Sequence, residues 1–172
     1  MSPFTPSQLA HLRRAMALAA EALEAGDAPF GSVLVSDGDG ADAVVREARN
    51  RVHTMGDATR HPEFELARWA AANMAPLARA AATVYTSGEH CAMCAAAHAW
   101  AGLGRIVYVA SMAQLAAWLA EFARENGGAG RVLPVAPLGV QSVAPGVRVE
   151  GPVAELEAEV KALHRRYAGL AV

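Results

Sequence analysis

The sequence contains very little lysine, isoleucine and cysteine, and the shortage of cysteine excludes a class of protein. Among 172 residues, Lys161 is the only lysine and Ile106 the only isoleucine, whereas alanine occurs 41 times and arginine 14 times. We attribute this skew to genome base composition, because the codons for alanine and arginine are rich in G and C. The two cysteines, Cys91 and Cys94, are too few and too close together for the disulfide framework of a small secreted protein.

The sequence also lacks a large excess of either charge and has no long apolar run. Fifteen basic residues face 17 acidic ones, for a net charge of −2, and no basic run occurs. A domain that grips a nucleic-acid backbone needs clustered positive charge, so the composition argues against nucleic acid as a partner. No apolar run reaches the roughly 18 residues of a membrane helix, and no signal peptide is visible. We therefore expect a cytoplasmic protein without a membrane segment.

The length suits one domain, and we expect a single domain over residues 1–172. Apolar periodicity predicts helices over residues 7–25, 62–74, 91–100, 112–125 and 152–167. Short β-branched or apolar runs predict strands at 32–35, 43–50, 82–86, 105–110 and within 132–143, with a turn at 37–40 and an irregular segment at 51–60. This alternation favours a largely parallel sheet, with one antiparallel hairpin and helices on both faces. The expected fold class is α/β, a three-layer α/β/α sandwich with a mixed five-stranded sheet.

Two short segments carry the candidate chemistry. Residues 60–63 read Arg-His-Pro-Glu, and residues 87–94 read Ser-Gly-Glu-His-Cys-Ala-Met-Cys. Each segment lies where a loop leads into a predicted helix. Helices that follow parallel strands begin at the carboxyl ends of those strands, where open α/β sheets bind ligands. The two segments are therefore expected to meet at one place.

A metal site can be assembled from these segments. His61, Cys91 and Cys94 offer one imidazole and two thiolates, a donor set that suits Zn²⁺. Structural zinc sites use four protein ligands, whereas three leave a position open for water, which is typical of a catalytic site. Glu63, two residues from His61, can exchange protons with that water without binding the metal.

The pattern His61-Pro62-Glu63 followed by His90-Cys91-Ala92-Met93-Cys94 matches the H-x-E and C-x-x-C motifs of the zinc deaminases. The chain resembles the cytidine deaminase-like superfamily, in particular its branch of guanine, cytosine and tRNA adenosine deaminases. Three further stretches are similar to that branch. They are Pro29-Phe30-Gly31 before a strand, Asn50 after the next strand, and Glu89 at the start of the cysteine motif.

The resemblance implies a zinc-dependent hydrolase that acts on C–N bonds of cyclic amidines. Its substrate would be an aminated heterocycle, either a nucleobase or a related pyrimidine, purine or triazine, with water as co-substrate and ammonia as product. Zinc on His61, Cys91 and Cys94 would yield a zinc-bound hydroxide, and Glu63 would shuttle the proton. The resemblance also implies a homodimer. The candidate substrate contacts are Asn50, Phe30, Glu89 and His90.

The chain departs from the family pattern at several positions. Pro62 stands where the family usually has alanine, and it lacks an N–H that could donate to a ligand. His90 replaces a proline and is expected to bring a titratable group to the rim. Ala113 or Gln114 stands where guanine deaminases have an aspartate, which argues against guanine and leaves Gln114 as a candidate to read another base edge.

Simpler interpretations remain open for single residues. The two cysteines alone could be a redox pair, and Glu63 alone could be a charge at a helix start. Glu89 could only fix its loop through backbone hydrogen bonds. His98 is expected to be packed rather than to bind metal, and Tyr167 is a candidate lid.

Two alternative functions also remain. One is adenosine deamination on tRNA, and the other is a non-catalytic zinc-binding module on the same fold.

Overall fold

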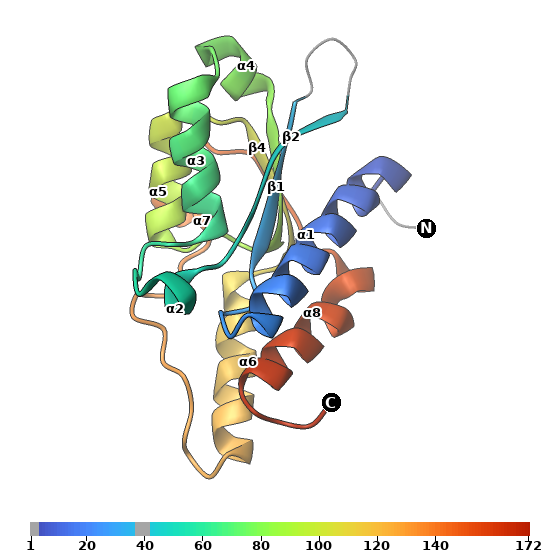
Figure 1. Cartoon of the computed structure of the whole chain (residues 1–172), viewed down its shortest axis with the longest axis vertical. Helices are drawn as coiled ribbons and strands as arrows, with labels where there is room; N and C mark the ends of the chain where they lie inside the picture. Colours follow the sequence, from blue (N-terminus) through green and yellow to red (C-terminus); the bar gives the residue numbers. More distant parts are fainter. Residues whose placement is uncertain (1–3, 37–41) are drawn as a thin grey trace.

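A mixed sheet with the strand order β2-β1-β3-β4-β5 lies at the centre of the computed structural model, which describes residues 4–36 and 42–172 (Figure 1). The described strands are β1 Gly31–Ser36, β2 Ala43–Arg49, β3 Thr83–Gly88, β4 Arg105–Ala110 and β5 Val149–Glu150. Strand β1 pairs antiparallel with both β2 and β3, whereas β3, β4 and β5 are parallel. The mixed five-stranded α/β fold expected from the sequence is confirmed.

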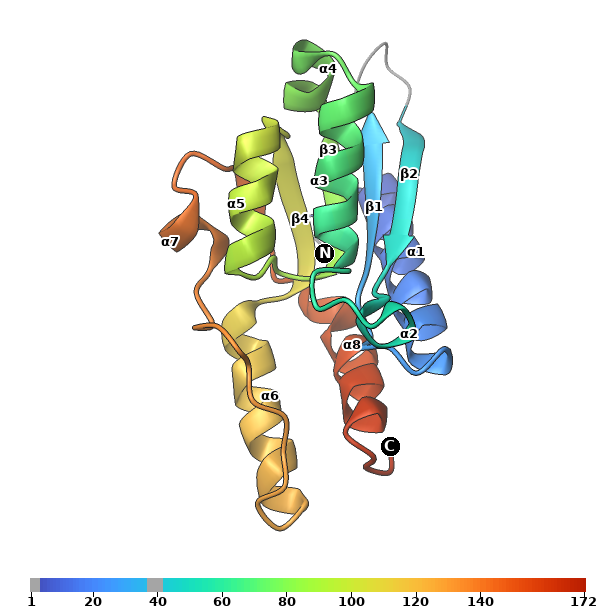
Figure 2. The ribbon, with the colours of Figure 1, turned by 60° about the vertical axis from the view of Figure 1, so that its left-hand side comes forward.

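Helices cover both faces of the sheet, as Figures 1 and 2 show. Helices α1 and α8 pack on one face, and α3, α4 and α5 cover the other. Helix α6 follows β4 and extends beyond the end of the sheet. The helix bounds are α1 Pro6–Glu24, α2 Val52–Met55, α3 Pro62–Asn73, α4 Pro76–Ala81, α5 Ala92–Ala101, α6 Met112–Glu125, α7 Val140–Val143 and α8 Ala154–Tyr167.

Small residues let α1 lie directly on the sheet. Strand β1 is buried on both faces, and Val33, Leu34 and Val35 are fully inaccessible. At the first residue of this strand, a β-carbon on Gly31 would collide with the backbone oxygen of Ala15. Glycine is therefore required at position 31, and it fixes where the chain enters the sheet immediately after Phe30.

Most predicted elements are present, with shifts of one or two residues at their ends, but two features of the sheet differ. The expected strand within 132–143 is wrong, because this segment contains Pro134 and Pro137, which cannot donate to a strand ladder. The last strand is instead β5. The expectation that only the first hairpin is antiparallel is also wrong. Helix α3 connects β2 to β3, which run in the same direction, and β1 lies between them.

Smaller differences concern the connections. The segment 51–60, expected to be irregular, contains the short helix α2, and Pro76 begins the unpredicted helix α4. The turn expected at 37–40 lies outside the described residues. No helix in the described part of the chain is both long and apolar enough to cross a membrane.

Candidate metal centre and substrate cavity

Two neighbouring helices begin at the same end of the sheet and bring the candidate metal ligands together. His61 is the N-cap residue of α3, and Cys91 is the N-cap residue of α5. Pro62 occupies the first turn of α3, where its missing N–H has no helical partner to lose. Helices α3 and α5 pack side by side. Residues separated by 30 positions in the sequence therefore meet because both helix starts lie beside the carboxyl end of β3.

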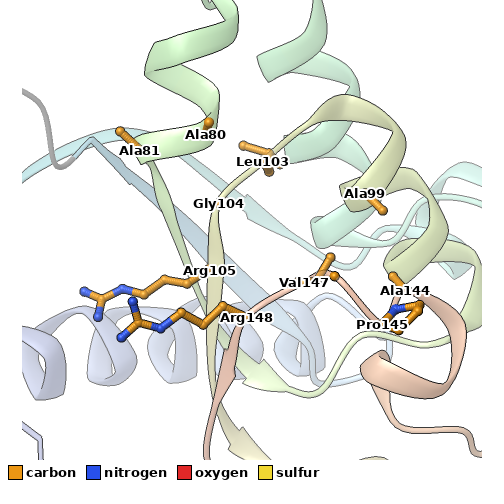
Figure 3. A pocket seen from close by; sticks show the side chains of 11 residues that line it. Ala80, Ala81, Ala99, Leu103, Gly104, Arg105, Ala144, Pro145, Val147 and Arg148 are labelled. Carbon is orange, nitrogen blue, oxygen red and sulfur yellow. The ribbon is translucent and has the colours of Figure 1, made fainter.

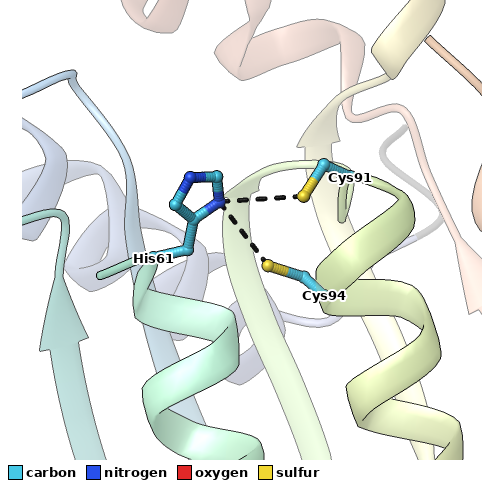
Figure 4. A group of neighbouring side chains, drawn as sticks. All are labelled: His61, Cys91 and Cys94. Carbon is cyan, nitrogen blue, oxygen red and sulfur yellow. Dashed lines mark hydrogen bonds between the residues drawn. The ribbon is translucent and has the colours of Figure 1, made fainter. Parts of the chain in front are cut away.

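The spacing of the three side chains fits a zinc ion. His61 Nδ1 lies 3.7 Å from Cys91 Sγ and 3.6 Å from Cys94 Sγ (Figure 4). All three donor atoms lie within 4.8 Å of one another. Zinc bonds of about 2.0 Å to nitrogen and 2.3 Å to sulfur, at a tetrahedral angle, separate the two donor atoms by roughly 3.6 Å. Both the donor types and their separations therefore suit zinc with one position open.

The two thiols have opposite pKa shifts. The pKa of Cys91 is lowered to about 4, chiefly by its hydrogen bond with Cys94 and further by one with His61. The same hydrogen bond, together with burial, raises the pKa of Cys94 well above its ordinary value. These opposite shifts favour the thiolate form at Cys91 and the thiol form at Cys94. Because metal binding requires both sulfurs as thiolates, it displaces the proton of Cys94.

A buried carboxylate stands beside this group. Glu63 is only 5% exposed, and burial raises its pKa. Its Oε1 accepts hydrogen bonds from Ser32 Oγ at 3.1 Å and from Thr86 Oγ1 at 3.2 Å. Its Oε2 lies 3.6 Å from Cys94 Sγ. One oxygen is therefore fixed from the sheet, while the other faces the metal group.

Ser32 and Thr86 belong to the candidate site, although our sequence interpretation did not single them out. Both are completely buried on neighbouring strands, and their hydroxyls also contact each other at 2.9 Å. The available signal was a hydroxyl residue within each of two otherwise apolar, buried strands. Buried hydroxyls require partners, and here the partner is the carboxylate of Glu63.

A cavity of about 300 Å³ opens beside the metal group and the carboxylate. It brings two of the predicted substrate contacts, Phe30 and Glu89, next to His61 and Glu63, whereas Asn50 and His90 do not line it. The lining residues are Phe30, Ala58, Thr59, His61, Glu63, Glu89, Cys91, Met93, Met112, Leu115, Leu133, Pro134 and Val135.

Asn50 holds the turn behind this cavity. Its side-chain Oδ1 accepts the backbone N–H of Val52 at 3.0 Å, and its backbone N–H donates to the carbonyl of Phe30 at 2.9 Å. Asp27 braces the same turn, since its fully buried carboxylate accepts hydrogen bonds from the backbone and side chain of Thr54 and from Arg49. These hydrogen bonds fit the simpler interpretation, in which Asn50 ends a strand in a turn.

His90 is not at the rim of the cavity. It is 1% exposed, and its ring meets the ring of His98 edge-on at 5.2 Å between centroids. Strand β3 continues to Gly88, two residues beyond its expected end, so the loop before Cys91 is short and His90 lies in the interior. His98 Nε2–H donates to the carbonyl oxygen of Gly104 at 2.9 Å. It packs as expected and is not part of the metal group.

Glu89 uses both carboxylate oxygens on the backbone. Oε2 accepts the N–H of Met112 at 2.8 Å, and Oε1 accepts the N–H of Val140 at 2.8 Å. It thereby ties the starts of α6 and α7 to the end of β3. The interpretation that Glu89 fixes loops through backbone hydrogen bonds accounts for both oxygens.

Gln114 is also occupied elsewhere. Its side-chain oxygen accepts the N–H of Ser111 at 2.8 Å, while its own N–H donates to Ser111 Oγ at 3.1 Å. The pair forms the capping box of α6, and neither Gln114 nor Ala113 lines the cavity. The expectation that Gln114 reads a base edge therefore does not fit its position.

A larger cavity, of about 820 Å³, lies near the beginning of β4 (Figure 3). Its charged lining residues are Arg105 and Arg148, which both contact Glu150 Oε1, at 3.3 and 3.2 Å. Among the described residues that line it there is no His, Cys, Asp or Glu. It lacks a metal-binding set and a proton acceptor, so we place the chemistry at the smaller cavity.

The α/β fold and the His-Cys-Cys group together define a zinc-binding α/β protein. A family model for the cytidine and deoxycytidylate deaminase zinc-binding region matches residues 6–110, more than half of the sequence. The chain belongs to this family of zinc-binding deaminases. The resemblance and the zinc cofactor expected from the sequence are confirmed.

Curated relatives with different named activities each match a little over half of the chain. The probable cytosine deaminase of Schizosaccharomyces pombe is 36% identical over 100 residues, 58% of this chain and 58% of that protein. The tRNA-specific adenosine deaminase of Agrobacterium fabrum is 34% identical over 94 residues, 55% of this chain and 59% of that protein. The chain thus spans about three fifths of the length of the curated relatives it matches.

A solved structure extends the likeness over more of the chain. The guanine deaminase of Bacillus subtilis is 30% identical, with a TM-score of 0.54, over 80% of this chain and 89% of that chain. Cytosine, guanine and tRNA adenosine deaminases are therefore all similar to this chain, and the likeness leaves the substrate open.

Proposed function

We propose that residues 1–172 form one deaminase domain that releases ammonia from a small aminated heterocycle by hydrolysis. The observation that carries this proposal is the buried carboxylate of Glu63, whose Oε2 lies 3.6 Å from Cys94 Sγ, at the wall of a cavity. A carboxylate that is desolvated, oriented by two hydroxyls and adjacent to a metal group is suited to proton transfer.

His61, Cys91 and Cys94 would hold the zinc. Zinc supplies Lewis acidity, which lowers the pKa of water and makes it a nucleophile at neutral pH. Glu63 Oε1 stays on Ser32 and Thr86, so Oε2 receives the proton from water. The OH adds to the ring carbon that bears the amine, and Glu63 passes its proton to the adjacent ring nitrogen. Glu63 then takes the proton of the added hydroxyl and gives it to the exocyclic nitrogen, so that a C=O bond forms, the C–N bond breaks and ammonia leaves.

The substrate contacts follow from the same arrangement. Phe30 lines the cavity and is held by an edge-on contact with His164, at 4.9 Å between ring centroids, so it can pack on the face of a heterocycle. Asn50 does not line the cavity, and its Oδ1 accepts the backbone N–H of Val52, so we assign it to holding the turn that carries Phe30. We assign positioning roles to Glu89 and His90. Glu89 lines the cavity but holds two helix starts with both of its oxygens, and His90 packs edge-on against His98.

An ammonia-release screen tests this function. The zinc-loaded protein is expected to deaminate at least one member of a panel of aminopurines, aminopyrimidines and amino-triazines. The measurement is ammonia formed per chain over time, with a zinc-free sample as control. A protein that holds zinc and releases no ammonia from any ring would favour the non-catalytic zinc-binding module instead.

Adenosine deamination on tRNA is the second candidate, because a tRNA-specific adenosine deaminase is 34% identical to this chain. The charge composition opposes it, since Lys161 is the only lysine and the net charge is −2. Neutralising several phosphates makes affinity fall steeply with salt. Nanomolar tRNA binding that weakens strongly between low and physiological salt would support this candidate over a free heterocycle.

We also propose that the chain forms a homodimer through α5. This helix contains no Asp, Glu, Lys or Arg, and Trp100 near its end is 90% exposed. An apolar helix face with a large exposed aromatic side chain is typical of an interface.

The variant Trp100→Glu is therefore expected to shift sedimentation from dimer to monomer. Met55→Glu, at a methionine that is 50% exposed on α2, is the matched control and should leave the dimer intact. Equal sedimentation of both variants and the parent protein would contradict an interface at α5.

A further inference from the structure

Beyond the metal group and Glu63, the cavity offers a ligand few polar partners. Thr59 and Glu89 are the other polar residues in its lining, and both oxygens of Glu89 accept backbone N–H groups. The rest of the lining is apolar, and none of the described residues that line it is a lysine or arginine. A phosphate or a second polar ring substituent would therefore lose water without gaining a charged partner.

One apolar wall comes from residues 131–139, which we call the strap. The strap follows α6 and returns alongside that helix toward α7 (Figure 2). Leu133, Pro134 and Val135 line the cavity, whereas the neighbouring Val132 is 89% exposed. Some side chains of the strap thus line the cavity, whereas that of Val132 lies in solvent.

Both ends of the strap are anchored. At its start, the guanidinium of Arg131 lies 3.7 Å from the ring centroid of Tyr167, a cation–π contact with the end of α8. At its far end, the N–H of Val140 donates to Glu89 Oε1 at 2.8 Å. Glu89 also holds Met112, which lines the same cavity. Tyr167 therefore anchors the strap, and Glu89 is a positioning residue for two parts of the apolar lining.

A ring that places its amine near Glu63 must place other edges against this lining. A carbonyl or amino group on such an edge gives up its hydrogen bonds to water and meets no other polar side chain of the described lining except Thr59, whose hydroxyl donates to Asp57 Oδ1, so its burial is unfavourable for binding. An alkyl group at the same place loses nothing and buries apolar surface. The lining thus discriminates between substituents by their polarity.

We propose that the site takes a small aminated heteroaromatic ring whose edge away from the amine carries an apolar substituent. This inference rests on the proposed deaminase function for the orientation of the amine. It excludes nucleotides, and it ranks bases with several polar edges below their alkyl-substituted counterparts.

Two rings of similar shape test the proposal by calorimetry on the full-length, zinc-loaded protein. Cytosine carries a carbonyl at the position where 4-amino-2-methylpyrimidine carries a methyl group. We expect the methyl compound to bind about tenfold more tightly or better, since pockets of this kind discriminate by roughly 10- to 200-fold per methylene-sized group. Cytosine binding as tightly or more tightly would overturn the proposal, and so would the failure of both rings to bind.

A pair of variants ties the preference to the strap. Leu133→Asn places an amide in the lining and is expected to reduce the affinity ratio of the two rings at least threefold. Val132→Asn makes the same change at the exposed neighbour and should leave the ratio unchanged. An unchanged ratio in Leu133→Asn, or an equal change in both variants, would overturn the role of the strap.

Binding and ammonia release separate this inference from the proposed function. Tighter binding of the methyl compound without ammonia from any ring would uphold the apolar preference and refute the deaminase. Ammonia release together with tighter binding of cytosine would support the deaminase and refute the apolar preference.

Discussion

Replacement of Glu63 by glutamine is expected to reduce ammonia release by about 10²- to 10⁴-fold, the range that a positioned general acid–base contributes. The amide oxygen can still accept hydrogen bonds from Ser32 and Thr86, so the side chain keeps its place. The amide nitrogen cannot take a proton from water. Zinc content should stay at the level of the parent protein, because the amide adds no charge and removes no ligand. The measurements are ammonia release and metal analysis on the same sample.

Glu65→Gln is the matched control for this experiment. Glu65 lies in the same first turn of α3, pairs with Arg46 at 3.7 Å, and does not line the cavity. Its replacement should leave ammonia release within about twofold, since surface changes away from the site have small effects. Undiminished ammonia release in Glu63→Gln with zinc still bound would contradict the proposed proton transfer.

Replacement of Cys94 by serine is expected to lower zinc affinity by more than about 100-fold, because loss of even an outer partner of a ligand costs 10- to 100-fold. Cys94 is fully buried, and its Sγ lies 3.6 Å from His61 Nδ1, so no other side chain can take its place without rearrangement. Ammonia release should fall with the zinc content. Competition with a chelator, followed by metal analysis, measures the change.

The thermal stability of Cys94→Ser should resemble that of the parent protein without its metal. Zinc binds the folded state, so the parent protein should lose thermal stability on chelation and regain it when zinc is returned. Cys94→Ser should unfold near the temperature of the chelated parent and respond little to added zinc. Full zinc occupancy in Cys94→Ser at the same chelator concentration would show that Cys94 is not a ligand.

The metal group could be predicted because it depends on short, local patterns. His61 and Glu63 are two residues apart, Cys91 and Cys94 are three apart, and each pair lies at a helix start that the sequence marks clearly. The topology then needs only to bring two helix starts together. The bounds of β4 and α6 were predictable for a similar reason, since each is a continuous run of one pattern.

The surroundings of the metal group depend on contacts between distant segments, and these were not predictable. Glu89 binds the backbone at positions 112 and 140, and nothing in its local sequence specifies either partner. The resemblance placed His90 at the rim, where the family has a proline, but β3 continues to Gly88 and leaves His90 buried. The last strand was expected within 132–143, a segment that contains most of the strap, whereas the fifth strand is Val149–Glu150.

The position of the strap in the sequence has an evolutionary consequence. The match to the deaminase family covers residues 6–110 and includes every residue of the metal group and Glu63. The strap and its partner Tyr167 both lie beyond that stretch. The proposed proton-transfer group and the strap's part of the cavity lining are therefore encoded in separate stretches of the sequence. Substitutions in the later part would change which ring the proposed site accepts while the metal group and Glu63 stay unchanged, which is a simple route by which related proteins come to differ in substrate.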